Sequence, residues 1–248
     1  MIFLKSNDEI QIMRRAGALV AEVLLKLKDE VKPGISTLEL DQIAEEHIRK
    51  NGAVPTFIGY QGYTKSLCTS INEEVVHGIP GDKKVSSGDI IGIDCAVTLN
   101  GYVADHAITF PVGEVTEDKL KLIQITKDGL DAGIAAFKLN NRIGDVGNAV
   151  QKKAKPHHYG VVRDFVGHGV GRKMHEEPQV PNFGKPGIGP RIKNGMVIAI
   201  EPMFNLGTHE VQVLNDGWTV VTKDNKDSAH FEHTIALSDK GPVLLTTV

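Results

Sequence analysis

Two stretches of the chain share one pattern: VSSGDIIGID at residues 85–94 and IKNGMVIAIE at residues 192–201, which lie 107 positions apart. In each stretch a glycine precedes alternating apolar residues, and the stretch ends on an acidic side chain. Buried strands often resemble one another, so chance accounts for part of this match. The shared glycine and the shared acid favour an internal duplication. We therefore expect two similar halves, near 1–112 and 113–248, facing each other in a single domain over residues 1–248.

Helix and strand signals around these stretches follow the same order in both halves. Ser6–Glu9 and Ser36–Glu39 have the S-x-x-E form of a capping box, which predicts a helix start at each. Strand-like segments follow at 66–71, 89–99 and 102–110, helices are expected near 117–137 and 145–154, and β-rich sequence extends from 161 to the end. The order predicts a mixed α/β (α+β) fold with antiparallel strands and flanking helices.

Composition excludes several classes of protein. The chain has 248 residues, 41% hydrophobic and 24% charged, with a net charge of -3. No basic surface is therefore expected to recognise nucleic acid, and no apolar run approaches the length of a membrane span. The first residues do not resemble a signal peptide, and the two cysteines have no metal-type spacing. We expect a cytoplasmic protein without membrane attachment.

The first half places two carboxylates on one face of a predicted hairpin. Asn100–Gly101 is a strong two-residue turn signal between two strand-like segments. Counting back from this turn puts Asp94 opposite Ala107, with Asp105 as a diagonal neighbour of Asp94 on the same face. The same parity directs His106 to the other face. Two carboxylates this close repel each other unless a cation lies between them.

The second half repeats this arrangement. Glu201 occupies the position equivalent to Asp94, and a further hairpin signal follows at 215–217. The alternating segment AHFEHTIAL, residues 229–237, then places Glu232 on the face opposite Phe231. We expect four acidic side chains to gather on two facing hairpins.

The glycine-rich stretch GHGVGRKMHEEP, residues 167–178, offers either His168 or His175 to the same cluster. We expect its glycines to let the backbone at His168 approach a pair of metal ions. Four carboxylates carry a charge of about -4, which two divalent cations neutralise; ligands of this kind suit Mn, Fe, Co or Zn. Two neighbouring ions can activate water, which indicates a hydrolase.

These motifs together resemble methionine aminopeptidase of type I in its short bacterial form. The resemblance rests on the Asp94 and Asp105 pair, the 167–178 stretch, Glu201-Pro202, Glu232, and TSINEEVVHGIPGD at 69–82. It implies the pita-bread fold, whose halves are related by a pseudo-twofold axis. It also implies removal of the N-terminal methionine from nascent polypeptides whose second residue is small, through a hydroxide activated by two metal ions.

The resemblance assigns roles to individual residues. It implies a dinuclear centre of Co, Mn, Fe or Zn with five ligands, namely Asp94, Asp105, His168, Glu201 and Glu232. Asp105 and Glu232 match the bridging acids, and Glu201 also matches the general base. His77 and His175 match catalytic histidines that contact substrate, at the scissile nitrogen and at the carbonyl oxygen. The methionine pocket matches Tyr60, Tyr63, Cys68 and Trp218.

Four positions depart from the commoner bacterial pattern. Phe57, Gln61 and Met174 replace residues of the pocket, and His106 follows a bridging acid where a small or hydroxyl residue is usual. The first three are expected to alter the pocket's shape, and His106 the surroundings of the ligands.

Two alternative functions are weighed against this one. Proline-specific peptidases of the same fold carry a separate N-terminal domain, for which this chain has no residues. A pita-bread protein that only binds RNA or protein would be expected to lose ligands and gain basic segments, whereas all five ligand positions are filled here. The resemblance further implies a monomer that meets nascent N-termini close to the ribosome exit site.

Overall fold

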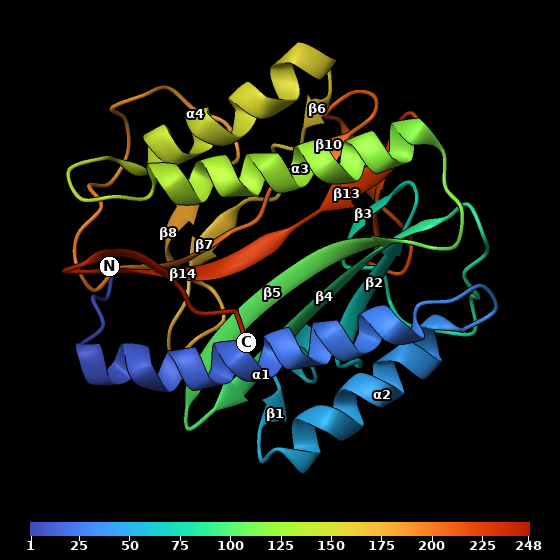
Figure 1. The fold of residues 1–248 in the computed structure, drawn as a ribbon, viewed down its shortest axis with the longest axis horizontal. Helices are drawn as coiled ribbons and strands as arrows, with labels where there is room; N and C mark the ends of the chain where they lie inside the picture. Colours follow the sequence, from blue (N-terminus) through green and yellow to red (C-terminus); the bar gives the residue numbers. More distant parts are fainter.

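A computed structural model describes residues 1–248, and its helices follow the predicted order (Figure 1). Both predicted capping boxes are confirmed: the Ser6 and Ser36 side chains accept hydrogen bonds from the backbone N–H three residues on. The helical elements are α1 (Asn7–Glu30), α2 (Thr37–Lys50), α3 (Glu117–Ala136) and α4 (Ile143–Ala154), with short 3-10 turns η1 (Tyr60–Gly62) and η2 (Lys155–His157).

A nine-stranded sheet runs through the whole molecule in the order β1-β4-β5-β14-β9-β7-β8, with β2 beside β4 and β15 beside β14. Its strands are β1 (Val54–Pro55), β2 (Leu67–Ile71), β4 (Ile90–Leu99), β5 (Tyr102–Pro111), β7 (Gly167–Gly169), β8 (Glu176–Val180), β9 (Val197–Ile200), β14 (Glu232–Ser238) and β15 (Gly241–Leu244). All of their pairings are antiparallel.

Two three-stranded sheets flank this main sheet. One has the order β13-β10-β6, from β6 (Gly160–Val161), β10 (Met203–Asn205) and β13 (Ser228–His230). The other has the order β11-β12-β3, from β3 (Glu74–Val76), β11 (Val211–Val213) and β12 (Val220–Thr222).

The predicted register of the first hairpin is confirmed. Asn100 and Gly101 both have positive φ, 51° and 78°, as a two-residue turn of this type requires. Asp94 pairs with Ala107, and Asp105 pairs with Ala96. The two aspartates therefore share one face of the sheet, as strand parity predicts.

The second hairpin was predicted to join the strands of Glu201 and Glu232, and this prediction was wrong. The turn at 215–217 connects β11 with β12, which lie in the sheet that contains β3. Glu201 and Glu232 instead come together because β9 pairs with β14, with His233 opposite Ile200. A local turn signal identifies the turn itself, but it does not show which distant strands will pair.

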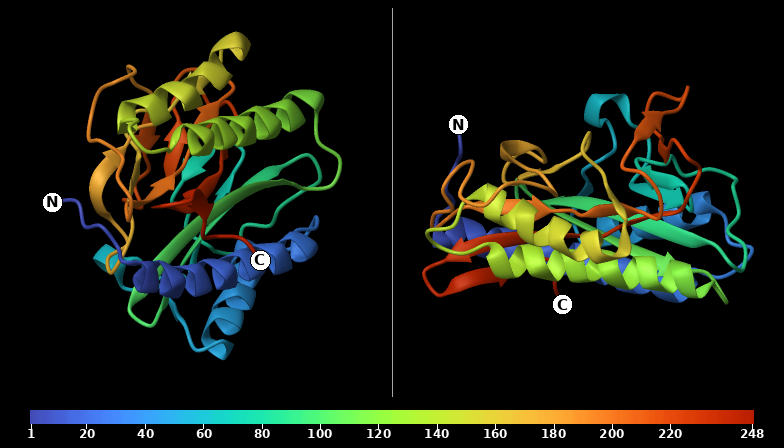
Figure 2. Two further views of the ribbon diagram at one scale, coloured as in Figure 1. Left: turned by 60° about the vertical axis from the view of Figure 1, so that its left-hand side comes forward. Right: turned by 90° about the horizontal axis from the view of Figure 1, so that it is seen from above.

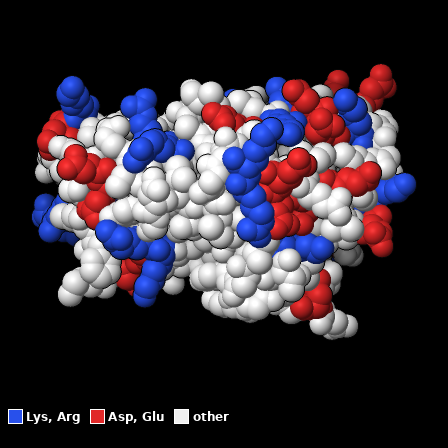
Figure 3. Space-filling model, turned by 90° about the horizontal axis from the view of Figure 1, so that it is seen from below, with Lys and Arg blue, Asp and Glu red and all other residues white.

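All four helices lie on one face of the main sheet (Figures 1 and 2). One buried apolar cluster lies where α1 and α2 cover the sheet, and another where α3 and α4 cover it. Basic and acidic side chains intermingle on the face shown in Figure 3. None of the helices is long and apolar enough to span a bilayer.

Candidate active site

Three carboxylates gather around Ala107 in the middle of the main sheet. Ala107 pairs with Asp94 on one side and with Glu232 on the other. Asp105 lies two residues earlier on the same strand, so its side chain points to the same face. Ala107 itself adds only a methyl group between these carboxylates.

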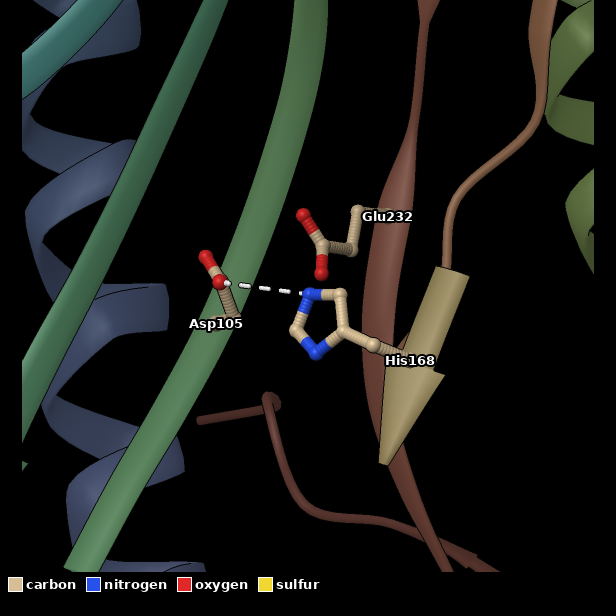
Figure 4. A group of neighbouring side chains, drawn as sticks. All are labelled: Asp105, His168 and Glu232. Carbon is tan, nitrogen blue, oxygen red and sulfur yellow. Dashed lines mark ion pairs between the residues drawn. The ribbon is translucent and has the colours of Figure 1, made fainter. Parts of the chain in front are cut away.

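Glu201 directly follows β9 and lies between two imidazole rings. Its Oε1 is 3.6 Å from Nε2 of His168, and its Oε2 is 3.6 Å from Nε2 of His230. Nε2 of His168 also lies 4.0 Å from Oδ2 of Asp105, as Figure 4 shows. Ligand atoms of Asp105, His168 and Glu232 all lie within 4.8 Å of one another. The four acids and His168 are thus brought into one cluster.

The glycines beside His168 are required by the packing of the strands. A Cβ at Gly167 would lie 2.4 Å from the carbonyl oxygen of Ala199, and a Cβ at Gly169 would lie 2.2 Å from that of Glu177. Real Cβ atoms do not approach this closely, so any side chain here would push the strands apart. The glycines are needed because β7 is held tightly between β8 and β9.

The cluster has the properties expected of a metal-binding centre. One oxygen each of Asp94, Asp105 and Glu232 is buried without a hydrogen-bond partner. Burial and the neighbouring carboxylates raise the pKa of Asp94, Glu201 and Glu232, and burial raises that of Asp105 to about 7. Buried carboxylates are stable when they are paired with cations or bind metal. The donor set therefore fits divalent metal ions.

The imidazole of His168 is suited to bind such an ion. Burial and the adjacent His175 lower the pKa of His168 to about 3, so the ring is neutral, as a metal ligand must be. Nδ1 lies 3.0 Å from the carbonyl oxygen of Gly169. A proton on Nδ1 would leave Nε2 free to face the carboxylates.

A cavity of about 190 Å³ opens directly over the carboxylates. Half of its sixteen lining residues are hydrophobic, and the four acids lie at its polar side. All four pocket residues implied by the resemblance line it, and so do three of the departures from the family pattern: Tyr60, Tyr63, Cys68, Trp218, Phe57, Gln61 and Met174. The Tyr63 and Trp218 rings meet edge to face with their centroids 4.9 Å apart.

His77 and His175 both line this cavity, although neither belongs to a ligand cluster. The Tyr60 hydroxyl lies 2.5 Å from Nδ1 of His175, and the His175 ring centroid is 4.3 Å from that of His168. His77 packs edge to face against Phe165 and Trp218. Burial lowers the pKa of His77 to about 4, which keeps its ring neutral.

His106 lies on the opposite face of the sheet, as its parity predicts. Its ring stacks on His233 with the centroids 4.4 Å apart, and its Nδ1 contacts the backbone carbonyl oxygen of Glu232. His106 therefore supports the strand that carries Glu232 without entering the cavity.

Sequence reasoning missed two residues of this region. Phe165 lines the cavity, and His230 contributes a nitrogen atom to a cluster with Glu201 and Glu232. The signal for His230 is present in AHFEHTIAL, because residues two apart on an extended segment share a face and Glu232 was already placed. Phe165 lies in an irregular loop, which offers no such periodicity.

Comparison with known proteins identifies the family. The model of metallopeptidase family M24 matches residues 11–239. The chain belongs to metallopeptidase family M24. Among M24 relatives, it is 52% identical to a methionine aminopeptidase of Clostridium perfringens over 248 residues, all of both chains. It is 50% identical to methionine aminopeptidase 1 of Bacillus subtilis, again over the full length of both.

Solved structures of M24 enzymes confirm the pita-bread fold. A methionine aminopeptidase of Thermotoga maritima superposes with a TM-score of 0.98 at 41% identity and covers all of both chains. One from Rickettsia prowazekii gives 0.98 at 41% identity, covering 99% of this chain and 100% of the other. A prolidase of Pyrococcus horikoshii shares the fold at 22% identity and a TM-score of 0.79, but this chain covers only 63% of it.

Proposed function

We propose that this M24 metallopeptidase removes the N-terminal methionine from polypeptides whose second residue is small. The observation that carries the proposal is the placement of a carboxylate and imidazole cluster at the polar side of a small, largely apolar cavity. The names of the relatives, with about half of the residues identical over the full chain, support methionine as the residue removed. They favour this activity over proline-specific hydrolysis and over a role in binding alone.

The proposed metal centre holds two divalent ions, either Co, Mn, Fe or Zn. Asp94, Asp105, His168, Glu201 and Glu232 would hold these ions, with Asp105 and Glu232 in the role of the family's bridging acids. The unpartnered carboxylate oxygens support this assignment, because bound cations would satisfy them. When bound, the ions would polarise the substrate carbonyl and lower the pKa of water.

The remaining polar groups act on the substrate in this proposal. Glu201 serves as general base, as the family resemblance implies, and it lines the cavity together with the other three acids. His77 contacts the scissile amide nitrogen, and His175 donates to the carbonyl oxygen as that oxygen gains charge. A Tyr60 hydroxyl that donates to Nδ1 of His175 would keep the proton on Nε2, which is the state a donor needs.

The apolar side of the cavity would accept the methionine side chain. Tyr63 and Trp218 form one aromatic wall, and Cys68 pairs with Asp94 across the sheet, next to the ligands. Met174 adds a flexible thioether surface and is buried. An aromatic and thioether lining favours an unbranched side chain that contains sulfur.

The setting of the enzyme is part of the same proposal. We place it in the cytoplasm, acting as a monomer on nascent N-termini close to the ribosome, and without nucleic-acid recognition of its own. We also propose that residues 1–248 form one catalytic unit of two similar halves, near 1–112 and 113–248. The continuous sheet from β1 to β8 supports a single unit.

Peptide cleavage with and without metal tests the proposal. Chelation should abolish activity, and added Co, Mn, Fe or Zn should restore it. Met-Ala-Ser should be cleaved far faster than Met-Lys-Ser. Full activity in rigorously metal-free protein would contradict the metal centre, while equal kcat/KM on the two peptides would contradict the preference for a small second residue.

A further inference from the structure

His230 is a buried residue whose backbone is fixed from two sides. It ends β13, where it pairs with Met203. Its backbone N–H donates to the Thr109 hydroxyl at 2.9 Å, and that hydroxyl donates to the His230 carbonyl oxygen at 2.8 Å. Only 4% of the residue is exposed. Its side chain therefore has a defined direction and little freedom to move.

The ring of His230 points its Nε2 atom into the carboxylate cluster. This nitrogen has no hydrogen-bond partner and lies 3.6 Å from Oε2 of Glu201. Ligand atoms of Glu201, His230 and Glu232 lie within 4.8 Å of one another.

The separation of these atoms suits shared ligands better than a hydrogen bond. Hydrogen bonds between nitrogen and oxygen span about 2.7–3.2 Å, which is shorter than the observed 3.6 Å. Two ligand atoms that each lie about 2.0–2.2 Å from one ion are roughly 3–4 Å apart, depending on the angle between them. The Nε2 to Oε2 distance falls in that range.

The cluster also contains two overlapping groups of candidate ligands. One contains Asp105, His168 and Glu232, and the other contains Glu201, His230 and Glu232. Each group has one imidazole, and Glu232 belongs to both. Glu201 also lies 3.6 Å from Nε2 of His168, so an ion held by Glu201 would have an imidazole within reach on either side.

We propose that His230 is a sixth protein ligand of the metal centre, binding through Nε2 next to Glu201 and Glu232. This assignment rests on the proposed metal centre and adds a second imidazole to its single one. Imidazole suits Zn, Fe, Co and Ni, whereas carboxylate and water suit Mn and Mg. His230 therefore biases the site towards Zn, Fe and Co and away from Mn.

Metal binding by the His230→Gln variant tests the assignment without using activity. Glutamine keeps a polar side chain of similar length and removes the imidazole. Metal-free wild type and variant are titrated with Zn²⁺ and Mn²⁺ by calorimetry, and X-ray absorption at the zinc edge counts the imidazoles per ion. His233→Gln is the matched control, because His233 is a mostly buried histidine on the same segment that stacks on His106 outside the cavity.

The wild type should show two imidazoles for two zinc ions, and His230→Gln only one. Zinc affinity should fall on the order of 10–100-fold in His230→Gln, with a much smaller change for manganese and none in His233→Gln. A single imidazole in the wild type, or unchanged zinc affinity in His230→Gln, would overturn the assignment. If His230→Gln does not fold, the number of imidazoles per zinc ion in the wild type is enough to test the assignment. Failure of the wild type to bind any ion would instead contradict the metal centre itself.

Discussion

His168 and His175 are neighbours in sequence and in space, but their surroundings give them different chemistry. Nε2 of His168 faces Asp105 and Glu201. Nδ1 of His175 is engaged by the Tyr60 hydroxyl, and the residue lies exposed at the mouth of the cavity. The first environment favours metal binding, and the second favours hydrogen bonding to a substrate.

Alanine variants of the two histidines should therefore fail in different ways. His175→Ala should keep its metal and lose on the order of 10²–10³ in kcat, because it lacks a donor to the developing charge. His168→Ala should lose metal affinity as well. Metal analysis of the purified variants together with single-turnover rates checks both expectations. Loss of metal from His175→Ala as readily as from His168→Ala would show that this division of roles is wrong.

At the scale of elements, two threonines join the strands that carry the proposed ligands. Thr109 on β5 binds the backbone of His230, and Thr234 on β14 binds the backbone of Asp105 through both its N–H, at 2.9 Å, and its carbonyl, at 2.8 Å. The β5 and β14 ladder contains only two residue pairs. The threonine hydroxyls thus extend the connection beyond the end of that ladder.

Thr234→Val should destabilise the protein by about 1–3 kcal/mol, because it leaves buried backbone groups of Asp105 without partners. Denaturant unfolding measures this loss. Thr69→Val is the control: Thr69 is equally buried in β2, yet its hydroxyl has no partner. That control should be neutral or slightly stabilising. Equal losses in the two variants would contradict a specific role for the Thr234 hydroxyl.

The turn between β11 and β12 positions Trp218 over the cavity. The Asp216 carboxylate accepts hydrogen bonds from the backbone N–H groups of Trp218 and Thr219, both at 2.9 Å, and from the Thr219 hydroxyl at 2.6 Å. These bonds fix the start of β12 and, with it, the aromatic wall.

Asp216→Ala should raise KM for methionyl peptides and leave kcat and metal content nearly unchanged. If loss of the Asp216 hydrogen bonds weakens substrate binding by about 1 kcal/mol, KM rises roughly fivefold. Asp239→Ala serves as control, since Asp239 accepts one side-chain hydrogen bond, from Asn194, in the turn after β14. Steady-state kinetics on Met-Ala-Ser measures this effect. Identical KM values for both variants would show that the turn does not shape the pocket.

At the scale of the whole molecule, one sheet brings acidic groups from distant parts of the chain into a buried cluster. This arrangement is costly without cations, because burial disfavours the charged carboxylates. Burial holds the pKa of Asp105 at about 7 in the folded protein, and the other three acids are also raised. In the unfolded chain these groups ionise near pH 4, at about their ordinary pKa.

The stability of the metal-free protein should therefore fall as pH rises from about 6.5 through about 7, the folded pKa of Asp105. Over that range the folded state holds more protons on these acids than the unfolded state, so the free energy of unfolding decreases with pH. Buried histidines such as His168 act in the opposite sense, but only below their unfolded pKa of about 6.5. Denaturant unfolding with chelator and with zinc checks this. Zinc should abolish the decline, and a flat metal-free profile would contradict the expectation.

Short-range rules determined much of the fold and half of the site. The capping boxes at Ser6 and Ser36 depend on residues three apart, and the β4 and β5 register depends on one tight turn. Strand parity then predicted that Asp94 and Asp105 share one face of the sheet and that His106 lies on the other. Each of these relations joins residues that are close in sequence or connected by a short loop, so the chain carries them locally.

The tertiary structure alone decided how the second pair of acids meets the first. Glu201 and Glu232 come together through the pairing of β9 with β14, and His230 reaches the same cluster from β13, which lies in another sheet. The closeness of β7 to its neighbours, which requires glycine on both sides of His168, was likewise not readable in advance. These contacts join distant segments, and periodicity shows which face a residue occupies without showing which distant strand will lie beside it.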